Sequence, residues 1–436
     1  MRPRRNVFRL LVAAEAAVLA AAVLFGVIQM AKPKAEPKAK TAPASREEDL
    51  YAVEGDSQGN LHTGEEAAQA DPGMPGTAEE ELLGGGQAQK EPQPAVFSEE
   101  VMAKLASMTL EEKVAQMFLT TPEALTRNDS VEVAGEGTRD AVHAYPVGGL
   151  VYSALNFQDK GQTRELLSGV QQYSSERIGL PLFLAVEEAG GDGSSPLASK
   201  NGYAIQRSPA ELGVGGRPEE AAQAADAIAA YLAEEGFNLN LSPLADLAGG
   251  ADSAHDSRCY GADAATVSMM VAEAVNAFHG KGVRTASGMF PGKGYGGSIT
   301  KGWAEWENSD ALAFRSAANA GTECIIVGNV ICESLTGDDQ ALCSLSVGAA
   351  YYLRNEMGYT GILMTDSLSD AAVTGKYSTG EAAVMAVKAG MDLLYCPADF
   401  EAAYQAVLDA AGRGEISTEE IDQAVGYILT EKMRSG

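Results

Sequence analysis

Histidine and cysteine are scarce in this sequence, and their shortage limits its chemistry. The 436 residues include 4 histidines and 5 cysteines, and no cysteines are spaced like the ligands of a structural metal site. We therefore predict no metal and no other cofactor. The cysteines stand mostly among apolar residues and are expected to be small core residues. A disulfide between Cys332 and Cys343, across the loop that separates them, stays open as an alternative.

Basic residues are also in deficit. Lysine and arginine together number 32 against 60 aspartates and glutamates, which gives a net charge of −28 at pH 7. A surface with this balance repels the phosphate backbone of nucleic acids. Nucleic acid is therefore excluded as a partner.

Long apolar runs are absent except for one near the start. Residues 10–30 contain a single charged side chain, Glu15, and follow four arginines. This length is enough to span a bilayer, so we predict an N-terminal transmembrane signal anchor over residues 1–30, with a cleaved signal peptide as the alternative. The basic start predicts a single-pass protein of the cell membrane whose C-terminal domain is extracytoplasmic, although lysines also flank the other end of the run.

Residues 31–95 are rich in Ala, Pro, Glu, Gly and Gln and show no apolar periodicity. Such a segment cannot bury enough surface to offset its chain entropy, so we predict a disordered linker. Residues 96–436 are then one folded domain.

Short apolar runs alternate with amphipathic helical stretches throughout this domain, and this alternation predicts an α/β fold of the (β/α)8 TIM-type barrel class. A doubly wound open sheet is the alternative, but no Gly-rich phosphate turn follows the first run. Helices are expected at 98–105, from Thr109 with Glu112 completing a capping box, and at 218–235, 262–280, 349–357 and 417–432. The predicted strands are 115–119, 149–152, 182–186, 237–241, 284–289, 324–327, 361–364 and 392–395.

The tips of these strands carry carboxylates and amides. Asp366 follows a wholly apolar run, and in a barrel its side chain would point into the mouth, so it is our candidate nucleophile. The alternative is that Asp366 caps the next helix. Glu187, Asp246 and Asn329 stand at other tips, whereas Glu188 faces away from its neighbour and is expected to be structural. Such a mouth suits polyhydroxylated ligands, and paired carboxylates suit glycoside hydrolysis.

Several segments, taken in order, resemble glycoside hydrolase family 3, in its single-barrel β-N-acetylhexosaminidase branch. The resemblance covers residues 98–436. The segments are MTLEEKVAQM from Met108, GGLVY from Gly148, PLFLAVEEAGG from Pro181, NLSPLAD from Asn240, FPG from Phe290, LRNEMGYTG from Leu353 and TDSLSD from Thr365.

The resemblance implies a cofactor-free retaining glycosidase that cleaves carbohydrate containing N-acetylglucosamine, such as peptidoglycan fragments. It places Asp366 at the nucleophile and Arg258 at a sugar-binding arginine, whose fork suits sugar hydroxyls. Glu187 stands in place of a sugar-binding aspartate, and Lys293 in place of a histidine after Phe-Pro-Gly. Asn329 and these three residues are the candidate substrate-binding side chains.

The branch also carries an acid/base histidine on the loop after Phe-Pro-Gly, and residues 294–301 of this chain contain none. His255 is the candidate substitute, with Glu305 and Glu307 as alternatives. A Schiff-base role for Lys293 is disfavoured by its loop setting. Two functions therefore stay open. One is a membrane-anchored glycosidase of altered competence, and the other is a non-catalytic glycan-binding or envelope scaffold protein.

Overall fold

The structure is a computed structural model that describes residues 95–249, 253–292 and 297–434. The predicted signal anchor, all but the last residue of the predicted linker, and Lys293 lie outside these residues. In the part of the chain that is described, no helix has both the length and the apolar character needed to cross a membrane.

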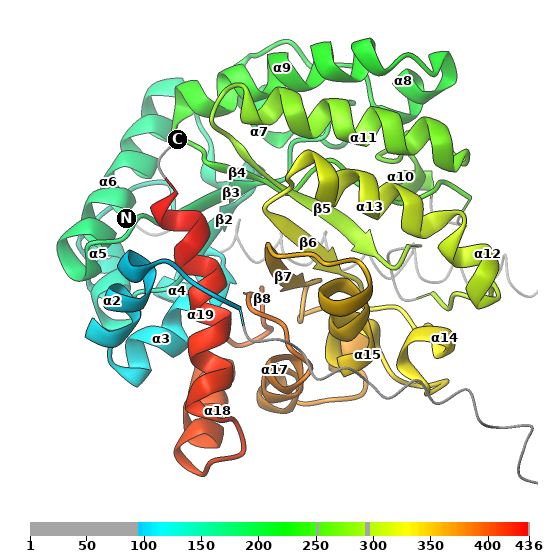
Figure 1. The fold of residues 1–436 in the computed structure, drawn as a ribbon. Coiled ribbons are helices and arrows are strands. Elements are labelled where there is room, and N and C mark those ends of the chain that lie inside the picture. Colours follow the sequence, from blue (N-terminus) through cyan, green and yellow to red (C-terminus); the bar gives the residue numbers. More distant parts are fainter. Residues whose placement is uncertain (1–94, 250–252, 293–296, 435–436) are drawn as a thin grey trace, which may run out of the picture. The chain divides into compact units, whose positions relative to one another are not determined.

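A ring of parallel strands forms the centre of the fold (Figure 1). The eight strands of the described residues follow the order β7-β6-β5-β4-β3-β2-β1-β8, and a single bridge between Met364 and Leu393 brings β7 beside β8. The strands are β1 (Phe118–Thr120), β2 (Gly149–Tyr152), β3 (Phe183–Val186), β4 (Leu239–Asn240), β5 (Arg284–Phe290), β6 (Cys324–Val327), β7 (Ile362–Thr365) and β8 (Leu394–Tyr395).

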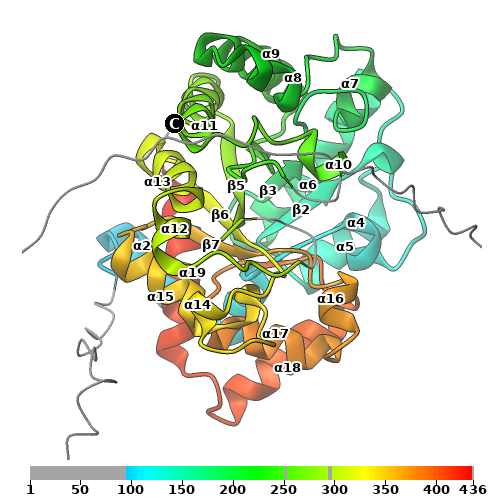
Figure 2. The ribbon, with the colours of Figure 1, turned by 90° about the vertical axis from the view of Figure 1, so that its right-hand side faces the viewer.

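Helices surround the ring, as the second view shows (Figure 2). The longer helices are α2 (Glu99–Ser107), α5 (Glu136–Ala144), α6 (Lys160–Ile178), α9 (Pro218–Glu235), α11 (Ala264–His279), α13 (Asp310–Ala320), α17 (Thr379–Lys388), α18 (Phe400–Gly412) and α19 (Thr418–Met433). The shorter ones are α3 (Leu110–Gln116), α4 (Pro122–Thr126), α7 (Pro196–Asn201), α8 (Pro209–Gly215), α10 (Ser253–Asp256), α12 (Trp303–Glu307), α14 (Glu333–Thr336), α15 (Val347–Tyr351) and α16 (Ala371–Thr374).

The predicted barrel is confirmed, and the open-sheet alternative is wrong. Most of the predicted strands coincide with observed ones to within two residues, because a strand covered on both faces is a continuous apolar run. The first strand is an exception. The predicted run 115–119 begins inside α3, whose capping box joins Thr109 and Glu112 as expected, and β1 starts only at Phe118. Val114 and Ala115 are apolar because that face of α3 is buried.

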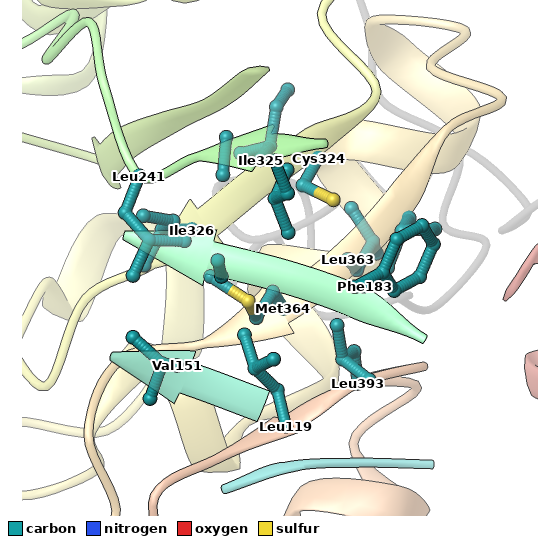
Figure 3. Packing of buried hydrophobic residues seen from close by; sticks show 14 of the residues in the cluster. Leu119, Val151, Phe183, Leu241, Cys324, Ile325, Ile326, Leu363, Met364 and Leu393 are labelled. Carbon is teal, nitrogen blue, oxygen red and sulfur yellow. The ribbon is translucent and has the colours of Figure 1, made fainter. Parts of the chain in front are cut away.

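The interior of the ring is filled with apolar side chains. Residues from all eight of the described strands contribute to one buried cluster, part of which is drawn in Figure 3. The side chains labelled there include Leu119, Val151, Phe183, Ile326 and Met364, all at most 8% exposed. A filled interior leaves chemistry to the loops at the C-terminal ends of the strands.

Candidate active site

Asp366 follows β7 directly and is 8% exposed. Its Oδ1 accepts a hydrogen bond from the Ser367 N–H at 2.7 Å, and its Oδ2 accepts one from the Asn329 N–H at 3.4 Å. Burial raises the pKa of this carboxyl to about 6, against the effect of the two N–H groups, and Asp370 and Asp246 raise it further. The next helix, α16, is capped by Asp370 at 2.7 Å to the Ala372 N–H. The helix-capping alternative for Asp366 is therefore wrong.

Asp246 and His255 form a buried pair in the segment after β4. The two atoms Nε2 of His255 and Oδ2 of Asp246 are 2.9 Å apart, and the two side chains are 4% and 0% exposed. The other carboxylate oxygen of Asp246 accepts a hydrogen bond from the Met289 N–H at the end of β5. Because Asp246 acts on Asp366 electrostatically and bonds to His255, it links the two candidate catalytic side chains.

Arg258 and Glu187 form an ion pair across the mouth, from the segments after β4 and β3. The Arg258 side chain is 11% exposed and that of Glu187 is 41% exposed. Both candidate sugar-binding groups therefore face the same space, and a ligand there must share or replace their contact.

Glu188 has the structural role that its position suggested. Its carboxylate accepts hydrogen bonds from the N–H groups of Leu197 and Ala198, at 3.0 and 3.2 Å, and from the Tyr231 hydroxyl at 2.8 Å. The side chain is fully buried, and this burial raises the pKa of Glu188 to about 7. Glu188 thus ties the start of α7 to α9.

Asn329 lies behind Asp366. It is fully buried, its Nδ2 donates to the Ser367 carbonyl at 2.8 Å, and its Oδ1 accepts from the Ser344 hydroxyl at 2.6 Å. With its backbone N–H directed at Asp366 as well, this residue is placed to orient the Asp366 carboxylate. This role could not be predicted from the sequence, because Asn329 lies in a different part of the chain from Ser344 and from the adjacent pair Asp366 and Ser367.

A cavity of about 620 Å³ opens over the ends of β1 to β4 and β8. Glu187, His255 and Arg258 line one part of it, together with Tyr395 at the end of β8. Asp366 and Asn329 are not among its lining residues. Among the described residues, no group of three or more His, Cys, Asp or Glu side chains is arranged to hold a metal ion.

Two candidate residues of the sequence lie away from this cavity. Glu305 is exposed on α12, and Glu307 is 3.5 Å from Arg315 in an ion pair. Tyr152, by contrast, lines the cavity from the tip of β2, and its hydroxyl is buried without a hydrogen-bond partner among the described residues. Sequence reasoning missed Tyr152, although the strand-tip rule that singled out Asp366 applies to it equally.

The fold and the site together define a (β/α)8-barrel protein with a carboxylate-rich, sugar-compatible mouth. The sequence matches the Glycosyl hydrolase family 3 N terminal domain over residues 109–430, and the chain belongs to this family. The resemblance found in the sequence is therefore confirmed.

Its relatives are mainly β-N-acetylhexosaminidases. A β-N-acetylglucosaminidase/β-glucosidase of Cellulomonas fimi is 24% identical over 77% of this chain and 59% of its own length. A β-hexosaminidase of Tolumonas auensis is 27% identical over 59% of this chain and 77% of its own length. The solved family 3 β-N-acetylglucosaminidase from a Paenibacillus strain is 28% identical, with a TM-score of 0.70, over 75% of this chain and 63% of that one. The chain thus spans about three fifths of the first and third of these relatives.

Proposed function

We propose that the protein is a glycoside hydrolase of the β-N-acetylhexosaminidase type, which hydrolyses O-glycosyl bonds of N-acetylglucosamine-containing glycans by a retaining mechanism. The observation that carries this proposal is the environment of Asp366. Its carboxylate stands at a strand tip, is held by two N–H groups, and has its pKa raised to about 6. A buried carboxylate of this kind can serve as a nucleophile once it is ionised.

In the first step, the Asp366 carboxylate attacks the anomeric carbon while the bond from that carbon to the leaving oxygen breaks. A general acid gives its proton to the leaving oxygen. In the second step, the same group takes a proton from water, the water oxygen attacks the anomeric carbon, and Asp366 is released.

We assign the acid/base role to His255, because it lines the cavity and its imidazole is held by Asp246 at 2.9 Å. Arg258 and Glu187 are assigned to the sugar hydroxyls, and Asn329 is assigned to the support of Asp366. Lys293, outside the described residues, remains a proposed contact to the sugar.

The proposed setting is the cell envelope. The apolar run at residues 10–30 and the basic residues before it support a single-pass anchor with an extracytoplasmic barrel. From there, peptidoglycan-related fragments are the accessible glycans that contain N-acetylglucosamine.

The test is chromophore release from an aryl N-acetyl-β-glucosaminide, with wild-type protein beside Asp366→Asn. Asp370→Asn, which removes a carboxylate from the same loop, is the matched control. We expect turnover in the wild type and the control, and a loss of several orders of magnitude in Asp366→Asn. Absence of turnover in the wild type would overturn the proposal.

A second candidate function is glycan binding without turnover. It is favoured by one observation, which is that the cavity is lined by Arg258 and Glu187 but not by Asp366. On this account, wild type and Asp366→Asn bind N-acetylglucosamine oligomers with equal affinity in calorimetry, neither hydrolyses them, and Arg258→Met binds more weakly.

A further inference from the structure

Two buried cysteines lie side by side in the loop after β6. Ile331 and Leu342 form an antiparallel bridge, and the Cys343 N–H donates to the Val330 carbonyl at 2.8 Å. Side chains alternate along such a pair, so Cys332 and Cys343 both face the side opposite to Ile331 and Leu342, as diagonal neighbours. They are 1% and 0% exposed, so both sulfurs are enclosed in the same core.

The two thiols interact directly and differ in character. The interaction with the Cys343 thiol lowers the pKa of Cys332, against burial, which raises it. The same contact raises the pKa of Cys343. Cys332 is therefore the sulfur more readily present as thiolate, the form that attacks a disulfide, and Cys343 is the resolving thiol beside it.

The segment between the two cysteines faces solvent, so a local opening is enough to admit an oxidant. It contains the short helix α14 (Glu333–Thr336) and the turn from Gly337 to Gln340, which is exposed. Local openings of this kind are less costly than global unfolding. Burial of the pair therefore slows its oxidation without preventing it.

The cysteines also adjoin the support of Asp366. Ser344, next to Cys343, holds the Asn329 side chain, whose backbone N–H is directed at Asp366. On the other side, Ile331 exchanges backbone hydrogen bonds with Gly297 and Ile299, at 3.1 and 2.8 Å, in the segment after β5. A covalent link between residues 332 and 343 would hold together the part of the chain that frames the nucleophile.

We propose that Cys332 and Cys343 are a redox modification site, and that a disulfide between them cross-links the loop after β6, next to the residues that support Asp366. In the reaction, the Cys332 thiolate attacks glutathione disulfide and releases one glutathione. Cys343 then attacks the sulfur of Cys332 and releases the second glutathione. Two protein thiols lose two protons and two electrons, and the glutathione disulfide bond is reduced to two thiols.

The test counts thiols in the full-length protein. It is incubated under native conditions with oxidised or reduced glutathione, then denatured and alkylated, and its mass is measured. The sequence has 5 cysteines, so the reduced protein should take five alkyl groups and the oxidised protein three. A protease that cuts before aspartates separates the two cysteines at Asp338, and the two resulting cysteine-containing peptides, called the halves below, should stay joined only after oxidation. The variants Cys332→Ser and Cys343→Ser should show no joined halves.

Thermal unfolding gives a second readout. Closing a loop of this length should raise the melting temperature of the oxidised wild type by about 4 °C over the reduced form. Cys343→Ser should show no difference between the two conditions. The proposal is overturned by five alkylated thiols after oxidation, by joined halves that persist in Cys332→Ser, or by equal melting temperatures. None of these readouts requires turnover, so they stand apart from the proposed hydrolysis.

Discussion

The substitution Asp366→Asn should destabilise the folded protein at pH 4 and stabilise it at pH 7. Burial raises the pKa of this carboxyl from its ordinary 3.8 to about 6. The folded protein therefore binds a proton that the unfolded chain has lost between these pH values. The contribution of Asp366 to the free energy of unfolding is therefore largest below pH 3.8 and falls as the pH rises toward about 6. Asparagine keeps the shape and never carries the charge.

The magnitude follows from the same two values. Each tenfold change in an ionisation equilibrium is worth 1.36 kcal/mol, so keeping Asp366 ionised at pH 7 costs the fold about 3 kcal/mol. In the wild type both carboxylate oxygens accept a hydrogen bond from a backbone N–H group. In the variant the amide NH2 group of asparagine faces one of these N–H groups, and this loss of an acceptor costs about 1 kcal/mol at every pH. The variant should be less stable than wild type by about 1 kcal/mol at pH 4 and more stable by about 2 kcal/mol at pH 7.

The assay is thermal unfolding of the purified protein at half-unit steps of pH. An unfolding entropy of about 2 cal/mol/K per residue gives a swing of about 4 °C between the two ends for a domain of this size. Asp370→Asn, measured in the same buffers, controls for the loss of one carboxylate from this loop. A difference in melting temperature between wild type and Asp366→Asn that stays constant from pH 4 to pH 7 would show that the pKa of Asp366 is not raised in the folded protein.

Three further changes test other parts of the site. His255→Gln should slow hydrolysis of a glycoside with a poor leaving group by about 10²–10⁴-fold and of its dinitrophenyl analogue far less, because only the poor leaving group needs a proton; equal losses on both would contradict an acid role. Arg258→Lys should raise KM about tenfold with little change in kcat, since it keeps the charge but loses the fork. Glu188→Ala should lower the free energy of unfolding by about 3 kcal/mol in urea titrations, because Tyr231 and two N–H groups lose their acceptor, and Glu188→Gln should lower it less.

The fold was readable from the sequence because each parallel strand buries both faces and so appears as an apolar run. The same logic found Asp366 at the tip of β7. It failed at β1, where the buried face of α3 continues into the strand through Gln116, a polar residue that is itself fully buried. Spacing alone cannot separate a buried helical turn from a short buried strand.

The contacts within the site were less predictable. The pairs His255 with Asp246 and Arg258 with Glu187 depend on how separate loops approach one another, and no local pattern encodes that approach. Asn329 was expected to contact the ligand. Its side-chain amide instead forms hydrogen bonds with Ser344 and Ser367, next to Asp366. Strand tips identify which residues reach the mouth, while tertiary contacts decide which of them face a ligand.

Asp366 is proposed to form the bond to the sugar, and rapid quenching can detect this role as a covalent adduct. The protein is mixed with a dinitrophenyl N-acetyl-β-glucosaminide, quenched in acid within its first turnovers, digested and analysed by mass spectrometry. This role predicts one N-acetylhexosamine residue attached to the peptide that contains Asp366, and none in Asp366→Asn. Product release with no adduct on that peptide, or an adduct on another residue, would contradict it.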